Sequence, residues 1–121
     1  IRDRPWYYDF DRMEQVLTNL VDNASRYTQP GDTIAIHAKS TIDQQILIVK
    51  DTGVGIPSEH LEKVFERFYK VDAARKRGKQ GTGLGLFITR MIIEAHGGHI
   101  DVDSRINEGT TFTITLPKKK A

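Results

Sequence analysis

Apolar residues recur at three- and four-residue steps in two stretches of the chain, which is the period of an α-helix with one buried face. The first stretch predicts a helix that Asp9 or Asp11 can cap and that runs to about Thr28. The second predicts a helix that follows a glycine-rich loop and stops at Gly97-Gly98. The predicted buried faces are Met13, Val16, Leu17, Leu20, Val21 and Ala24 in the first helix and Leu84, Phe87, Ile88, Met91, Ile92 and Ala95 in the second.

Elsewhere the chain alternates apolar and polar residues or has short runs rich in Ile, Val and Thr, which predicts strands. Two hairpins are expected, from residues 33–39 with 45–50 and from residues 99–104 with 110–116. Between them, Ser58 is expected to cap a short helix. This order predicts an α+β two-layer sandwich, with a mixed, mostly antiparallel sheet packed on about three helices.

Composition restricts the function classes. The chain has 121 residues and no cysteine, which predicts one domain over residues 1–121 without disulfides and fits an intracellular setting. A span of the bilayer needs about 20 apolar residues, and no run approaches that, so we expect this domain not to be membrane-inserted. The net charge of +2 is too small to predict nucleic acid as a partner.

The glycine-rich loop Gly81-Thr82-Gly83-Leu84-Gly85-Leu86 lies at the start of the second predicted helix. Its backbone N–H groups and the partial positive charge of the helix N-terminus together make an anion site, for which phosphate is the usual ligand. A plain turn is an equal alternative for such a loop taken alone.

The first predicted helix carries a polar stripe beside its apolar face. Arg12, Gln15, Asn19, Asn23 and Arg26 fall within roughly an 80° arc. An Asn oxygen suits Mg²⁺, which takes a few protein oxygens together with phosphates and waters. A solvated polar face is the alternative, and Tyr27 at its edge is either a surface for a base or an ordinary boundary tyrosine.

Two further segments carry candidate chemistry. Asp51 ends a strand beside Gly53 and Gly55, where a carboxylate can accept a hydrogen bond from an exocyclic amine; a routine Asp-x-Gly turn is the alternative. Arg67 and Lys70 are candidates for contact with a terminal phosphate. They open a basic stretch, residues 66–80, that we expect to act as a lid over a polyanion, with a solvated charge run as the alternative.

Taken in order, five segments resemble the N, G1, F, G2 and G3 boxes of the catalytic ATP-binding domain of sensor histidine kinases, in the wider family shared with DNA gyrase B, Hsp90 and MutL. The segments are Asn19-Leu-Val-Asp-Asn23-Ala, Asp51-Thr-Gly-Val-Gly55, Phe65-Glu-Arg-Phe68-Tyr-Lys-Val-Asp, Gly81-Thr-Gly-Leu-Gly85-Leu and Gly109-Thr110-Thr-Phe. The resemblance covers essentially the whole chain. The amino-acid sequence of the F box and lid is similar to that of the ResE/SrrB-type respiration-linked kinases.

The resemblance implies a residue set for Mg-ATP. Asn23 would coordinate Mg²⁺, with Asn19 supporting it or a phosphate through water. Asp51 would bind the adenine amino group, with Thr110 helping through a bound water. The remaining contacts implied for the nucleotide are Arg26, Tyr27, Gly53, Gly55, Ile56, Lys70, Gly81, Thr82, Gly83, Leu84, Gly85 and Leu86. Lys70 stands where these kinases often have arginine and Arg26 where they often have lysine, which keeps the charge and changes the hydrogen-bond geometry.

The same resemblance separates transfer from hydrolysis. In the gyrase and MutL pattern a glutamate one turn before the metal-binding asparagine activates water, whereas here that position is Asn19, which cannot take a proton. Transfer to a histidine is therefore expected, with Asn19, Lys70 and Arg67 in the catalytic set. The histidines His37, His60, His96 and His99 lack the usual phosphoacceptor context.

We therefore expect the acceptor histidine on a separate dimerisation domain and a response regulator as the next partner, with this domain monomeric when isolated. The resemblance also implies a cytoplasmic domain of a membrane-bound sensor kinase. Three alternatives stay open: a degenerate nucleotide-binding regulatory module, an ATPase of the gyrase and Hsp90 type, and a kinase acting on serine of an anti-sigma partner.

Overall fold

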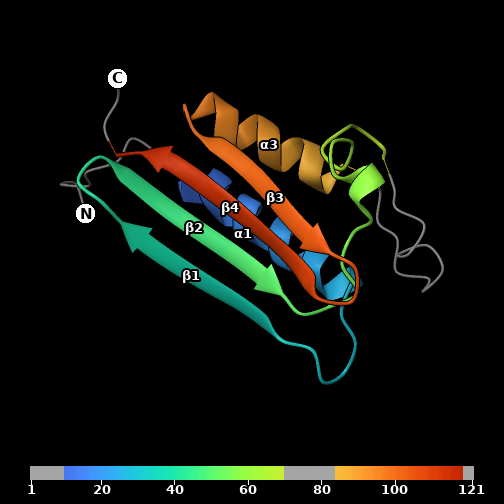
Figure 1. Ribbon diagram of the computed structural model, residues 1–121. Helices are drawn as coiled ribbons and strands as arrows, with labels where there is room; N and C mark the ends of the chain where they lie inside the picture. The colour runs from blue at the N-terminus through green and yellow to red at the C-terminus, as the bar shows by residue number, and fades with distance from the viewer. Residues whose placement is uncertain (1–9, 70–83, 119–121) are drawn as a thin grey trace.

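In the described residues, 10–69 and 84–118 of this computed structural model, a four-stranded antiparallel sheet forms one layer and two α-helices form the other (Figure 1). The helices are α1 (Phe10–Arg26) and α3 (Gly85–Ala95), and a short 3-10 helix, η1, spans Ser58–His60. The strands are β1 (Ile34–Ser40), β2 (Gln44–Asp51), β3 (His99–Arg105) and β4 (Gly109–Pro117), in the spatial order β1-β2-β4-β3.

The predicted two-layer α/β sandwich and both hairpins are confirmed. Every strand pair in the described part of the chain is antiparallel, whereas a mixed sheet was expected. Two α-helices and η1 correspond to the three expected helices. The predicted lid, residues 66–80, lies outside the described residues from residue 70 onward.

The predicted cap at Ser58 is wrong. Pro57 precedes η1 as its cap residue, Ser58 is the first residue inside, and no side chain caps the helix. Hydrogen bonds of the tight i to i+3 type, such as from Leu61 N–H to the Ser58 carbonyl, continue toward Tyr69. The segment is therefore a series of 3-10 turns, because its i to i+3 hydrogen bonds replace the i to i+4 bonds that an α-helix needs.

The predicted buried face of α1 is confirmed except at Val21, which is only partly buried and does not belong to the core. Val16 and Leu20 are fully buried, Met13 and Ala24 nearly so, and the flanking Leu17 is partly buried. These side chains pack on alternate residues of β2 and β4, where Val49, Phe112, Ile114 and Leu116 point into the core. The alternation arises because successive side chains of a strand face opposite sides of the sheet.

The predicted face of α3 is partly wrong. Met91 is 55% exposed and Ala95 is exposed, whereas Thr89 and Ile93 are buried beside Ile92. The apolar residues surround most of this helix, so several stripes fit the 3.6-residue period equally well. The packing of α3 on α1 and on the sheet decides which face of α3 is buried. The periodicity of one segment carries no information about that packing.

No helix among residues 10–69 and 84–118 is long and apolar enough to cross a membrane.

Two glycines allow segments of the chain to meet backbone against backbone. A Cβ on Gly109, at φ +120°, would collide with the Asp51 carbonyl of the neighbouring strand. A Cβ on Gly53 would collide with the Tyr27 carbonyl, which accepts a hydrogen bond of 3.0 Å from Val54 N–H. The end of β2 is therefore held between the start of β4 and the residue that follows α1.

We expect Gly109→Ala to lower the free energy of unfolding by about 3 kcal/mol or more, because it adds a backbone collision to a strained φ. Gly31→Ala is the matched control, since Gly31 also has a positive φ, +99°, but open space around the position of a Cβ. That control should cost only about 1–2 kcal/mol. Urea unfolding of both variants measures the difference, and equal losses would contradict the close approach at Gly109.

Candidate functional site

Asp51 is a buried carboxylate at the end of β2. Its side chain is 2% exposed, and Gly53 N–H donates to its Oδ1 at 2.9 Å. Burial raises the pKa of this carboxyl above its usual value, while the backbone N–H groups of Gly53 and Thr110 partly oppose the shift. Burying a carboxylate costs free energy unless its oxygens find donors, so a ligand that donates a hydrogen bond here would be bound favourably.

Asn23 is the second polar side chain that the fold buries. It lies on α1 with 8% of its surface exposed, and its Nδ2 is buried without a hydrogen-bond partner among the described residues. An unpaired buried donor costs about 1–3 kcal/mol. A site that binds a ligand can carry such a cost, because the ligand supplies the missing partner.

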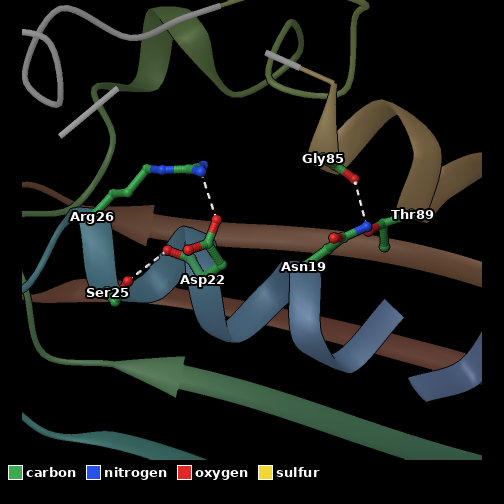
Figure 2. A network of polar contacts seen from close by, with 6 residues as sticks. All are labelled: Asn19, Asp22, Ser25, Arg26, Gly85 and Thr89. Carbon is green, nitrogen blue, oxygen red and sulfur yellow. Dashed lines mark hydrogen bonds and ion pairs between the residues drawn. The ribbon is translucent and has the colours of Figure 1, made fainter. Parts of the chain in front are cut away.

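Asn19 connects α1 to the first turn of α3. Its Nδ2 lies 3.4 Å from the Gly85 carbonyl and 3.3 Å from Thr89 Oγ1 (Figure 2). Leu84 is the cap residue at the N-terminus of α3, and its side chain makes no capping hydrogen bond. The amide of Asn19 thus holds the N-terminal turn of α3, a helix end that attracts anions, and Asn19 lies one turn from Asn23 on α1.

Arg26 at the end of α1 and Tyr27 just after it each have partners within the chain. Arg26 points toward Asp22 and forms an ion pair of 2.5 Å with its Oδ2 (Figure 2). The side chain of Tyr27 belongs to the core, and desolvation by burial raises the pKa of its hydroxyl to about 12. Tyr27 therefore stays a neutral phenol at ordinary pH.

In the loop after β2, the predicted residues face other parts of the chain. A Cβ on Gly55 would collide with the Arg105 carbonyl, just as one on Gly53 would collide with Tyr27. Ile56 is buried in the core and its N–H donates to Ser104 Oγ at 2.7 Å. These contacts give both glycines a reason in chain packing, whether or not a nucleotide approaches them.

The predicted phosphate contacts are described only in part. The guanidinium carbon of Arg67 lies 5.7 Å from the ring centroids of Phe68 and of Phe87, which is within the range of a cation–π interaction with each ring. Leu84 and Leu86 are partly buried at the start of α3, and Gly85 has open space at its Cβ position. Lys70, Gly81, Thr82 and Gly83 lie outside the described residues.

Two residues at the site were missed by sequence reasoning. Thr89 is fully buried and meets the Asn19 amide, and Ser104 Oγ contacts Ile56 N, the Gly109 carbonyl and Thr110 Oγ1. The second hairpin contained the signal for Ser104, because its register places Ser104 directly opposite Thr110. Nothing in the sequence indicated Thr89, since it stands in an apolar helix.

These residues fit a nucleotide with a magnesium ion. No group of three or more His, Cys, Asp or Glu side chains in the described residues could hold a metal by itself. Mg²⁺ needs no such cage, because it binds through one or two protein oxygens together with phosphates and waters. The amide oxygen of Asn23 is a ligand of the kind that Mg²⁺ takes, and the unpaired N–H of the same buried amide can donate to a phosphate or water oxygen. Asp51 supplies a buried acceptor for the other end of a nucleotide.

The family of histidine kinase-, DNA gyrase B- and HSP90-like ATPases matches residues 8–120 of the chain. Sensor protein SrrB of Staphylococcus aureus strain NCTC 8325 is 68% identical over 117 residues, which are 97% of this chain and 20% of SrrB. The chain thus spans about a fifth of the length of this curated relative.

Solved structures of histidine kinases share the fold. The catalytic domain of histidine kinase ThkA, in a nucleotide-free form, is 37% identical with a TM-score of 0.79, covering 93% of this chain and 71% of that one. The mycobacterial sensor histidine kinase MprB is 27% identical with a TM-score of 0.80, covering 96% of this chain and 78% of that one. Full-length ShkA in complex with AMPPNP is 29% identical with a TM-score of 0.77, covering 91% and 22%.

The raised pKa of Asp51 predicts a pH-dependent stability. The unfolded carboxyl, with its ordinary pKa of 3.8, loses its proton at lower pH than the folded one. The contribution of Asp51 to the free energy of unfolding is therefore greatest below pH 3.8 and falls as the pH rises through the folded pKa. Asp51→Asn cannot titrate, so the stability of the natural chain minus that of the variant should fall over this window and then stay constant. Urea unfolding from pH 3 upward measures it, and a difference that rises with pH would contradict the burial of the carboxylate.

Proposed function

We propose a function from one premise: this chain belongs to the family of histidine kinase-, DNA gyrase B- and HSP90-like ATPases. It is the ATP-binding catalytic domain of a sensor histidine kinase. It binds Mg-ATP and transfers the γ-phosphoryl group to a histidine on the dimerisation domain of the kinase, from which the group passes to an aspartate of a response regulator. Its substrate ATP is a cytoplasmic nucleotide, so the domain acts in the cytoplasm.

The observation that carries transfer over hydrolysis is the environment of Asn19. An ATPase needs a base beside the attacking water, and the carboxylate that supplies it in gyrase and MutL is replaced here by an amide. That amide already donates toward Gly85 and Thr89 on α3. Asn19 therefore acts as a tie between two helices and cannot accept a proton, which favours a nucleophile that needs less activation than water.

Each part of the site would hold one part of the nucleotide. The Asp51 carboxylate, buried at 2% exposure, would accept a hydrogen bond from the adenine amino group. The amide oxygen of Asn23 would be the protein ligand of Mg²⁺, which when bound offsets phosphate charge and helps to orient the γ-phosphoryl group. The N-terminus of α3 would hold phosphate oxygens.

The transfer step is a substitution at the γ-phosphorus. A ring nitrogen of the acceptor imidazole forms the new P–N bond with its lone pair, while the bond from the γ-phosphorus to the bridging oxygen breaks. ADP leaves with that electron pair, and the proton of the attacked imidazole passes to solvent. Little covalent chemistry falls to the protein, so positioning and charge stabilisation by Arg67 and Lys70 would supply the catalysis.

We expect the isolated chain to bind ATP but not to label itself with radioactive γ-phosphate. Addition of the dimerisation domain of the parent kinase as a separate polypeptide should produce phosphohistidine, which is stable in base and labile in acid. Asn23→Ala should abolish transfer, and Lys70→Ala should reduce transfer more than ATP binding, because a charge at the γ-phosphate matters most as the group moves.

Three outcomes would contradict this function. Label on the isolated chain would place an acceptor within these 121 residues. Free phosphate without phosphohistidine would favour an ATPase. Binding of ATP with neither product in the mixture would favour a regulatory nucleotide-binding module. Ile42→Ala, at an exposed position in the β1–β2 turn, is a matched control that should leave every rate unchanged.

A further inference from the structure

We propose that Ser104 determines base specificity: its hydroxyl orients the hydroxyl of Thr110, so that the adenine end of the site presents hydrogen-bond acceptors only. Ser104 is thus a positioning residue that acts through Thr110. This proposal rests on the proposed function, since it takes the space beside Asp51 and Thr110 as the place of the base.

The sheet register sets these three residues in one row. Ser104 of β3 lies opposite Thr110 of β4, and Thr110 lies opposite Asp51 of β2. Paired residues of an antiparallel sheet share a face, here the face that α1 and α3 cover. Thr110 is 2% exposed, like Asp51, and Ser104 is partly buried. The hydroxyl protons in this row are therefore governed by the chain and only to a small extent by solvent.

The contacts of Ser104 leave one arrangement of protons that satisfies all of them. Its Oγ lies 2.7 Å from Ile56 N, which can only donate, and 3.0 Å from the Gly109 carbonyl, which can only accept. Its third neighbour, Thr110 Oγ1 at 2.8 Å, can do either. Ser104 has one proton, and the Gly109 carbonyl takes it. Thr110 must then donate its own proton to Ser104 Oγ.

The consequence for Thr110 is that its hydroxyl has only lone pairs left to offer. Asp51 beside it also offers lone pairs, because an ionised carboxylate only accepts and the hydrogen bond from Gly53 N–H to Oδ1 leaves further lone pairs open. Whether the base or a bridging water meets this pair, the group that arrives must donate. The amino group of adenine donates, whereas guanine and hypoxanthine present a carbonyl oxygen at the same position and find no donor.

Removal of the Ser104 hydroxyl frees the Thr110 proton. In Ser104→Ala the Thr110 hydroxyl can rotate and donate to a carbonyl-bearing base. Because one hydrogen bond is worth about 0.5–1.5 kcal/mol, we expect the ratio of ATP to inosine triphosphate affinity to fall about two- to twelvefold. Isothermal titration calorimetry on the 121-residue chain with each nucleotide and Mg²⁺ measures the ratio directly.

Three further variants separate orientation from loss of structure. Ser104→Thr keeps the hydroxyl and should restore the ratio. Thr41→Ala removes a side-chain hydrogen bond in the β1–β2 turn, where Thr41 Oγ1 accepts from Gln44 N–H at 3.0 Å, and should leave the ratio unchanged. In a Thr110→Val background, Ser104→Ala should no longer change the ratio, since no hydroxyl is left to orient.

The outcomes of this test are distinct from those of the proposed function. A Ser104→Ala variant that weakens both nucleotides equally would overturn the orientation role, as would an unchanged ratio, and would leave the proposed function intact. A natural chain that binds neither nucleotide would overturn the proposed function itself. If Ser104→Ala does not fold, Ser104→Cys gives the same comparison, because a thiol is a weak donor and acceptor.

Discussion

The burial of the Asp51 carboxylate is the constraint on which the other features of the site depend. A buried carboxylate is tolerated only where donors reach it, and the chain brings two backbone N–H groups there, from Gly53 and from Thr110. Those donors are in reach because β4 starts with a glycine against the Asp51 carbonyl and because the loop after β2 turns back against the Tyr27 carbonyl. Close backbone approach, more than side-chain packing, therefore shapes this end of the sheet, and it keeps a polar acceptor buried there.

A second buried polar group that costs free energy lies on α1, and it also points to a ligand. Asn23 leaves its Nδ2 buried and unpaired among the described residues, while Asn19, one turn earlier, spends its amide on α3. The two asparagines thus have different roles. Asn19 fixes the helix N-terminus that would hold phosphates, and Asn23 keeps an unpaired N–H for a ligand. Proteins tolerate such locally destabilising groups where function requires them, because other parts of the fold offset the cost in free energy. Here the offset comes from the continuous core between α1 and strands β2 and β4.

Much of this arrangement could be predicted from the sequence, because local patterns carry it. The span of α1, its buried face and both hairpins follow from hydrophobic period and turn residues, and the register of the second hairpin follows from its turn at Asn107. The candidate site residues came from five segments whose sequence and order along the chain resemble the boxes of sensor histidine kinases. What could not be predicted depends on contacts between distant segments. Met91 fits an apolar stripe yet is exposed, because α1 and the sheet select another face of α3. The hydrogen bonds of Ser104 join three segments, so no single segment indicates them.

The central claim is that polar groups buried on α1, β2 and β4 are kept for a nucleotide. Nuclear magnetic resonance during a titration with Mg-ATP tests it most directly. The side-chain amide of Asn23, assigned by its loss in Asn23→Asp, should shift together with the backbone amides of Gly53 and Thr110, while Asp101 and Thr113 on the outer face of the sheet stay unchanged. A contradictory result would be shifts confined to the hollow on α1 lined by Leu17, Thr18, Val21, Asp22 and Ser25, with the resonances of Asn23, Gly53 and Thr110 unmoved.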